Sequence, residues 1–410
     1  MTITHFKNPR YLRTTLALFS VAVLFLLSAC AGPKEVLKPV FFPPLPDEPH
    51  IQFLTSINES SFMEDTSLFK SLVSGMEKPN VITRLLKPYG IALNKGVIYV
   101  CDTVPNTVYR IDLKGKKFES IKGNAGSGGL KKPVNLSIDE EGTLYVADSL
   151  RNEVMVYTGE GEFVRAVGRG ILTKPVATAV DKENLYVLDA TDRVIKVLDR
   201  KSGAYIREFG KTADLGDNLV LPVGLTRDDQ GFLYVTNVGT GKVIKLDTDG
   251  HVILSFGKIG DFLGEFTRPK GIAVDKKGRI YIVDTGNQNV QIFSPERTLL
   301  LVFGSPGLVR GSLNLPAGIT VTTEFPDFFR PFVDPKFEVE ELILATSQGQ
   351  SGREMINVYA IGRYTGTFTK PSELQPPPAK VGAPGKPATP VKPGVNPVPE
   401  VKDDGVDAPR

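Results

Sequence analysis

Apolar residues fall in short runs along most of this chain, and Gly, Asp or Asn residues separate the runs. The pattern is clearest between residues 268 and 304. Four β-branched or aromatic runs follow one another there, at residues 272–274, 280–283, 290–293 and 299–303. Such runs between turn-forming residues predict β-strands joined by tight turns. This segment is therefore predicted to be a unit of four consecutive strands.

The same unit recurs along the chain, and a proline precedes the first strand of each copy. The prolines are separated by 45, 42, 47, 47 and 47 residues, at Pro88, Pro133, Pro175, Pro222, Pro269 and Pro316. A period of this length with four strands per unit predicts a β-propeller with one blade per repeat. The last unit is the least regular, because residues 324–335 interrupt it.

One strand-like segment, Ile51–Ile57, precedes the first repeat and has no unit of its own. We expect it to be the outer strand of the sixth blade, because pairing the start of the chain with its end removes two exposed strand edges. The prediction is an all-β, six-bladed propeller over residues 51–364. Between this strand and the first repeat, helical spacing predicts a short packed helix at Leu68, Phe69, Leu72 and Val73.

The repeat resembles the NHL repeat family. The matching motifs are Pro-x-Gly-Ile-Ala-Val-Asp, as at 269–275, then Ile/Leu-Tyr-Val-x-Asp, Val-x-x-Phe and Phe-Gly, and together they cover about residues 87–359. The chain has no Trp, which argues against the related WD repeat. The resemblance implies the six-bladed propeller. It does not imply a function, because propellers host many chemistries.

The N-terminus has the layout of a bacterial lipoprotein signal. Lys7, Arg10 and Arg13 precede an apolar stretch from Leu16 to Leu27. That stretch is too short to cross a bilayer comfortably, and the Leu-Ser-Ala-Cys sequence that ends at Cys30 matches the lipobox. We predict a signal peptide over residues 1–29, lipidation of Cys30, and a Pro-rich membrane tether over residues 30–50. The alternative is an ordinary signal peptide with a chance cysteine.

The predicted location is the bacterial cell envelope. Ala31 follows the cysteine where an Asp would suggest retention at the inner membrane, so we expect the outer membrane. Residues 365–410 are rich in Pro, Lys, Ala and Gly and are predicted to be disordered. The sequence leaves two roles open for this tail. It either extends to a partner or through peptidoglycan, or it is a passive extension.

Composition excludes several chemistries. The net charge of +3 is too small to indicate nucleic-acid binding, and export makes such binding implausible. The three histidines, His5, His50 and His251, are too few for a histidine-based zinc site or a histidine triad in the propeller. NHL-like amidating lyases use metal-bound histidines, so their chemistry is not expected here. We predict no metal and no cofactor, and we expect Cys101 to be a small buried residue.

Recurrent acidic residues and one glycine-rich segment suggest ligands but are better explained by turns. Asp102, Asp148, Asp189 and Asp284 share one repeat position with Asn237, which indicates a turn cap common to Asp and Asn rather than a calcium site. The glycine-rich residues 123–129 lead into a strand, so they predict a loop between blades rather than a phosphate cradle.

Two features indicate partner contacts. The residue before the repeat proline is basic in four units, at Lys87, Lys132, Lys174 and Arg268, and is Leu221 or Leu315 in the other two. Because this position precedes the innermost strand, we expect these residues to converge on one channel mouth and attract an anion. Solvated loop residues are the alternative.

The second feature is a set of phenylalanines in the interruption of the last repeat: Phe325, Phe328, Phe329 and Phe332. They either fold back onto the blade or form an exposed contact patch.

The favoured function is therefore a lipid-anchored interaction or scaffold protein, which binds an envelope protein or an anionic polymer and is held at the membrane by its lipid. The alternative is an envelope lyase or lactonase-like enzyme on a similar propeller. Whether the chain is an enzyme stays open, with a non-catalytic role favoured. Three or more acidic, Asn or His side chains that point into the channel would favour the enzyme.

Overall fold

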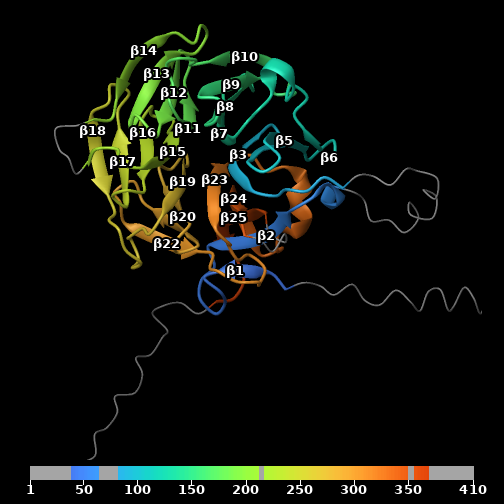
Figure 1. Cartoon of the computed structure of the whole chain (residues 1–410). Coiled ribbons are helices and arrows are strands. Elements are labelled where there is room, and N and C mark those ends of the chain that lie inside the picture. The colour runs from blue at the N-terminus through green and yellow to red at the C-terminus, as the bar shows by residue number, and fades with distance from the viewer. Residues whose placement is uncertain (1–37, 64–81, 212–216, 350–354, 369–410) are drawn as a thin grey trace, which may run out of the picture. The chain divides into compact units, whose positions relative to one another are not determined.

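The chain forms six antiparallel sheets arranged as blades around a central channel (Figure 1). The structure is a computed structural model, and it describes residues 38–63, 82–211, 217–349 and 355–368. Five sheets have four strands each, and the sixth has five. The six-bladed all-β propeller predicted from the repeats is confirmed.

The strands of each blade follow one another outward from the channel. The inner strands are β3 (Pro88–Asn94), β7 (Pro133–Ile138), β11 (Pro175–Val180), β15 (Pro222–Arg227), β19 (Pro269–Val274) and β23 (Pro316–Thr322). The second strands are β4 (Val97–Asp102), β8 (Leu144–Asp148), β12 (Asn184–Asp189), β16 (Leu233–Asn237), β20 (Ile280–Asp284) and β24 (Phe337–Ser347). The third strands are β5 (Thr107–Asp112), β9 (Glu153–Tyr157), β13 (Val194–Asp199), β17 (Lys242–Leu246), β21 (Asn289–Phe293) and β25 (Ile356–Tyr364). The outer strands are β6 (Lys117–Ser120), β10 (Phe163–Val167), β14 (Tyr205–Phe209), β18 (Val252–Phe256), β22 (Leu299–Phe303) and β2 (Ile51–Ile57).

The inner strands pack against one another in chain order, and β23 returns to β3 to complete the ring. Glycine permits their close approach. A Cβ atom on Gly224 would lie 2.2 Å from the carbonyl oxygen of Lys270, and one on Gly318 would lie 2.1 Å from that of Tyr89. A larger residue at either of these two positions would separate the neighbouring strands. This is the physical reason for Gly in the four repeats that have Pro-x-Gly, whereas the second and third repeats have Asn135 and Ala177 there.

The start of the chain closes the sixth blade. Strand β2 pairs with β25, with Ile51 opposite Ile361 and Ile57 opposite Ile356. The predicted closure is therefore confirmed. A further strand, β1 (Val40–Phe42), adds to the outside of β2. It lies in the segment for which the sequence predicted an extended tether, and it shows that sheet pairing begins before Ile51.

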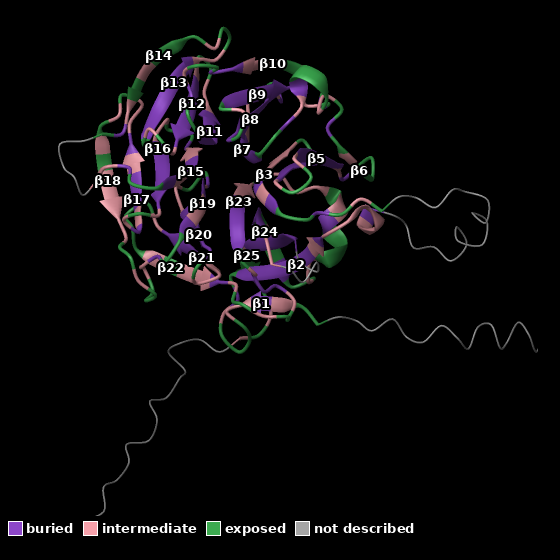
Figure 2. Cartoon of the chain, in the orientation of Figure 1, coloured by how far each residue is buried: buried purple, intermediate pink, exposed green. Residues whose placement is uncertain are grey.

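The hydrophobic core lies between neighbouring sheets. The second and third strands are buried almost throughout, whereas the outer strands are partly exposed (Figure 2). Cys101 is fully buried, as predicted, and it belongs to a cluster that joins the first and second blades through Val146 and Tyr157. Each blade therefore supplies both faces of its sheet to the core, which accounts for its continuous apolar runs.

Helical structure among the described residues consists of short 3-10 turns. They are η1 (Ser60–Met63), η2 (Gly126–Gly128) and η4 (Asp327–Phe332). Turn η2 lies between β6 and β7, so the glycine-rich segment is a loop between blades, as predicted. In the described part of the chain, no helix has the length and apolar character needed to cross a membrane. The predicted helix at 68–73, Cys30 and most of the Pro-rich tail lie outside the described residues.

Candidate functional site

The six repeat prolines lie on one face of the ring, which we call the proline face. Each begins an inner strand and pairs with the last residue of the second strand, for example Pro88 with Asp102 and Pro269 with Asp284. In the sixth blade Pro316 pairs with Ser347. The residues before the prolines, the turns after the second strands and the loops between blades all belong to this face, because the inner and outer strands both meet it at these ends.

The recurrent Asp or Asn residue organises the proline face. Its side chain is fully buried in all five regular blades. In the first blade the carboxylate of Asp102 accepts hydrogen bonds from the backbone N–H of Leu86 at 2.6 Å and of Lys87 at 2.9 Å. It also accepts the N–H of Val104 in the following turn at 3.2 Å. The predicted turn cap is therefore present, but its stronger bonds hold the loop that leads into the inner strand.

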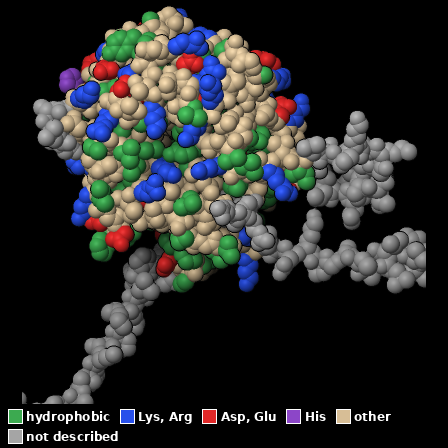
Figure 3. Space-filling view, in the orientation of Figure 1, with side chains coloured by type: hydrophobic (Ala, Val, Ile, Leu, Met, Phe, Trp, Pro, Cys, Tyr) green, Lys and Arg blue, Asp and Glu red, His purple; other side chains and the backbone are tan. Residues whose placement is uncertain are grey.

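The same bond positions each predicted basic residue. The backbone N–H of Lys132, Lys174 and Arg268 donates to Asp148, Asp189 and Asp284 at 2.9, 3.1 and 2.9 Å. Lys87, Lys132, Lys174 and Arg268 are all exposed, and we call them the basic rim. Within the described residues, none of their side chains forms a hydrogen bond or an ion pair. Figure 3 shows basic side chains gathered around the central hollow of the face in view, and acidic ones towards its edge.

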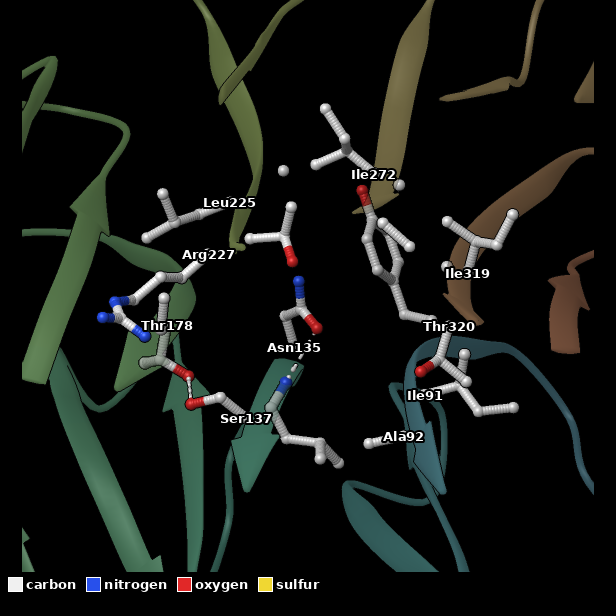
Figure 4. A pocket seen from close by; sticks show the side chains of 18 of the residues that line it. Ile91, Ala92, Asn135, Ser137, Thr178, Leu225, Arg227, Ile272, Ile319 and Thr320 are labelled. Atoms are coloured by element: carbon white, nitrogen blue, oxygen red, sulfur yellow. Dashed lines mark hydrogen bonds between the residues drawn. The ribbon is translucent and has the colours of Figure 1, made fainter. Parts of the chain in front are cut away.

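The channel behind the basic rim is a cavity of about 310 Å³, and all six inner strands line it. Its wall is mostly aliphatic (Figure 4), with Ile91, Leu225, Ile272 and Ile319 among the lining residues. Polar side chains also line it, and two of them satisfy each other, because the hydroxyls of Ser137 and Thr178 lie 2.8 Å apart.

Two cations, Arg227 and Lys270, line the channel, and Lys270 is the one influenced by the basic rim. It follows Pro269 directly, at a position where the other repeats have Tyr, Val or Ala. Its Nζ atom lies 5.3 Å from the ring centre of Tyr89, which is a cation–π distance. No carboxylate among the described residues is paired with it. The sequence analysis did not single out Lys270, although it is a charged residue at a repeat position that is otherwise Tyr, Val or Ala.

Burial and neighbouring charge both act on Lys270. Desolvation lowers the pKa of its amine to about 8, and repulsion from Arg268 and Lys87 adds to the shift. Burial also raises the pKa of Tyr89 to about 12, so its hydroxyl stays neutral at physiological pH. Two cations of the basic rim therefore lie close enough to Lys270 to influence it, and the site lacks an internal anion near this amine.

The channel does not contain the cluster expected for the enzyme alternative. Asn135 is the lining residue of the acidic, Asn or His kind, and its Oδ1 accepts the backbone N–H of Leu136 at 2.8 Å. Elsewhere in the described ranges, His, Cys, Asp and Glu side chains form no group of three or more that is arranged to hold a metal ion. The lining therefore gives the lyase or lactonase alternative no support.

The four phenylalanines of the interrupted repeat fold back onto the propeller. Phe329 is fully buried, and Phe325 and Phe328 pack against the core between the sixth and first blades. Phe332 is 37% exposed and stacks on Phe62, with ring centres 6.3 Å apart. Of the two arrangements left open by the sequence, the structure has the folded-back one. The segment is fixed by Gln52, which donates to the Phe332 carbonyl at 3.0 Å and accepts the Asp334 N–H at 3.0 Å.

Comparison with known proteins supports the repeat assignment. The NHL repeat family matches residues 266–293, which contain the first three strands of the fifth blade and the residues just before them. The remaining blades carry the same strand pattern in the structure.

Solved structures similar to this chain are propellers of low sequence identity. A structural genomics protein of unknown function from Bacteroides thetaiotaomicron is 16% identical, with a TM-score of 0.52 over 76% of this chain and 76% of that one. A gluconolactonase from Xanthomonas campestris is 15% identical, with a TM-score of 0.48 over 68% and 86% of the two chains. Virginiamycin B lyase from Staphylococcus aureus is 14% identical, with a TM-score of 0.45 over 67% and 95%. At these identities the likeness concerns the fold alone.

Proposed function

Because this chain is a six-bladed β-propeller that carries an NHL repeat, we propose that it is a lipid-anchored binding module of a bacterial cell envelope. In this proposal Cys30 carries the lipid, and the proline face holds an acidic envelope partner, such as a protein or an anionic polymer. The propeller acts as a rigid platform, since all its blades are joined in one closed ring.

The observation that carries the proposal is the unpaired state of the basic rim within the described residues. Ion pairs elsewhere in the propeller neutralise their cations, as Arg200 is neutralised by Asp139 at 3.1 Å and Glu141 at 3.1 Å. The carboxylates beneath the rim are buried and already accept backbone N–H groups. An approaching anion therefore meets the exposed cations first. Their electric fields add at the channel mouth, because the ~8 Å screening length at physiological salt does not isolate these cations fully from one another.

The test is charge reversal of the whole rim, because one exposed contact contributes only ~0–1 kcal/mol. A chain with Lys87→Glu, Lys132→Glu, Lys174→Glu and Arg268→Glu is used as bait on solubilised membranes at several salt concentrations. Proteins, anionic lipids and polymers that co-purify are identified. We expect capture of the acidic partner to be lost, together with its sensitivity to salt.

A matched control carries the same change of charge on the opposite face. Lys114, Lys182, Lys201 and Lys276 are exposed in turns there and are each replaced by Glu. This variant should retain the wild-type partners. Recovery of the same partners at the same salt by the rim variant would show that the rim is ordinary solvated surface.

A further inference from the structure

We infer that the proline face docks on an anionic lipid surface, with two apolar loop tips inserted among the headgroups. The inference rests on the proposed function and deepens it, because it identifies the acidic partner as the phosphate-bearing headgroups of the membrane that holds the anchor.

The apolar tips are the first observation. The loop between β18 and β19 exposes Ile259, Phe262 and Leu263 by 63%, 75% and 72%, and the loop between β22 and β23 exposes Leu308 and Val309 by 88% and 70%. These are the five most exposed large apolar side chains of the described residues. Both loops join an outer strand to the next inner strand, so both lie on the proline face. Exposed apolar side chains gathered on one face mark an interaction site.

Each tip is held by a buried base, so its exposure does not come from a loosely packed loop. In the first loop Phe266 is fully buried, its N–H donates to the Lys258 carbonyl at 2.9 Å, and the N–H of Gly264 donates to the Gln291 side chain at 2.9 Å. In the second loop Leu313 is fully buried, and its N–H donates to the Ser305 carbonyl at 3.0 Å. The fold presents these side chains to the solvent in a defined arrangement.

The path of the N-terminal chain is the second observation. In the second loop, the guanidinium of Arg310 donates to the carbonyl oxygen of Lys38 at 3.1 Å, so the tether joins the propeller beside Leu308 and Val309. Strand β1 runs away from the proline face, since Val40 pairs with Phe53 and Phe42 with Ile51. The chain therefore arrives from the side of the proline face.

The length of that tether limits the distance to the membrane. Cys30 and Lys38 are separated by eight residue steps, 38 minus 30. Even a fully extended chain of this length reaches only about 28 Å. A lipid on Cys30 therefore keeps Lys38, and with it the loop of Leu308 and Val309, close to the bilayer.

Charge complementarity selects the kind of surface. The basic rim and Lys270 lie on the same face as the apolar tips and lack carboxylate partners in the described part of the chain. Cations on the same face as protruding Phe and Leu side chains fit a bilayer interface, where phosphates lie above the acyl chains. A soluble acidic protein would need the cations but would leave the apolar tips in water.

The chain contains no Trp, so a single introduced Trp reports on one tip alone. Full-length mature protein is purified in detergent and reconstituted into vesicles of phosphatidylethanolamine and phosphatidylglycerol. In Phe262→Trp and Leu308→Trp we expect blue-shifted emission and, with brominated lipids, loss of about half of the emission, as suits a ring that lies ~5–10 Å below the headgroup plane. Vesicles of phosphatidylcholine should give a smaller change. The matched control is Leu300→Trp on β22, which is 51% exposed on an outer strand and should show no change.

The outcomes separate the inference from the proposed function. Co-flotation with vesicles and the intact mass of the N-terminal fragment report on the anchor. If the protein is acylated and floats with the vesicles but the Trp emission at the tips is not quenched, the docking inference is wrong. The proposed anchored module would still stand. Absence of an acyl group on Cys30 would overturn the proposed anchor, whatever the tips do. A concentration-dependent blue shift without vesicles would assign the tips to a second copy of the chain, and would also overturn the inference. Each variant is first shown to unfold at the wild-type urea midpoint.

Discussion

Two sets of cations in the ring differ in their partners. On the face opposite the prolines, one set lies between carboxylates from two elements, while other basic residues there, such as Lys114 and Lys182, have no ion-pair partner among the described residues. Arg279, before β20, contacts Asp275 in its own blade and reaches Glu341 of the sixth blade at 3.0 Å. On the proline face the basic rim has no such partners among the described residues. A cation paired with carboxylates of two blades stabilises the fold. A cation without an ion-pair partner can instead bind an anion from outside the chain.

The acidic residues show the same division. On the opposite face Asp139, Asp181, Asp228 and Asp275 accept a hydrogen bond from a tyrosine hydroxyl of the same blade, at 3.0, 2.8, 3.0 and 2.9 Å. On the proline face, the carboxylates of Asp102, Asp148, Asp189 and Asp284 accept backbone N–H groups beneath the surface. Both series follow from repeat positions. The second series is occupied mainly by backbone N–H groups, and although Asp189 also lies 3.6 Å from Lys196, none of its members pairs with the basic rim.

The largest expected effect comes from removal of a cation between blades. Arg279→Met leaves Asp275 and Glu341 without their counter-charge, and their side chains are only 1% and 4% exposed. We expect the free energy of unfolding to fall by about 3–5 kcal/mol, the usual cost of a buried charge left without its partner. Urea unfolding at pH 7 measures it.

Lys132→Met on the basic rim is the control for that experiment. It removes an exposed cation without a carboxylate partner in the described residues, and we expect a change within about 0.5 kcal/mol. Similar losses in the two variants would contradict the distinction between paired cations and the basic rim.

A smaller effect is expected from the buried cap beneath the rim. Asp284 accepts the backbone N–H of Thr267 at 2.8 Å, of Arg268 at 2.9 Å and of Gly286 at 2.9 Å. Asp284→Ala leaves these donors unpaired and should cost about 2 kcal/mol, measured by urea unfolding. Asp284→Asn should cost about 1 kcal/mol or less, because Asn237 accepts the equivalent N–H groups in the fourth blade at 3.0 and 3.1 Å. Equal losses would show that the cap acts by packing alone.

The smallest effect concerns pH and Lys270. The pKa of its amine is lowered from 10.5 to about 8 in the folded chain, so the unfolded chain binds this proton more tightly. The charged amine therefore destabilises the fold below pH 8, and stability recovers as the pH rises from 8 towards 10.5. Lys270→Met should be about 1 kcal/mol more stable at pH 7, which is less than the full shift implies because the side chain is partly exposed.

The measurement is urea unfolding of both proteins between pH 7 and 10.5. The advantage of the Lys270→Met variant should shrink over the upper part of that range. A constant difference between the two proteins would show that the amine does not titrate with a lowered pKa. An anion bound at the mouth should reduce the difference at pH 7, because it stabilises the charged amine.

Much of the fold could be predicted because each blade repeats one local pattern. The prolines, the Tyr-rich second strands and the turn residues identify five blades, and the unpaired segment Ile51–Ile57 identifies the closure. Strand β1 was not predicted, because its three residues lie among prolines and pair only through β2. The fold-back of residues 324–335 depends on a pocket made by other blades, which no local pattern records.

The candidate site was predicted only in part, because only some of its residues belong to the repeated pattern. The members of the basic rim share one repeat position, so the repeat predicted that they lie on one face. Lys270 is a single exception within a repeat, and the apolar tips lie in two loops of equal length, residues 257–268 and 304–315, whose tip residues differ in sequence. Which loop side chains are exposed is decided by the buried residues Phe266 and Leu313 beneath them, and that packing required the structure.

The pairing of β2 with β25 has a consequence for the order of assembly. Ser56 and Asn357 are hydrogen-bonded neighbours although 301 positions separate them, whereas the other five blades are each made from one continuous stretch. In a chain made from its N-terminus, those five can form as they emerge, but the first strand has to wait for the last. The N-terminal strand is thus the last to be paired. A product that stops before Ile356 leaves β2 without β25, and its unpaired edge marks the chain for proteolysis.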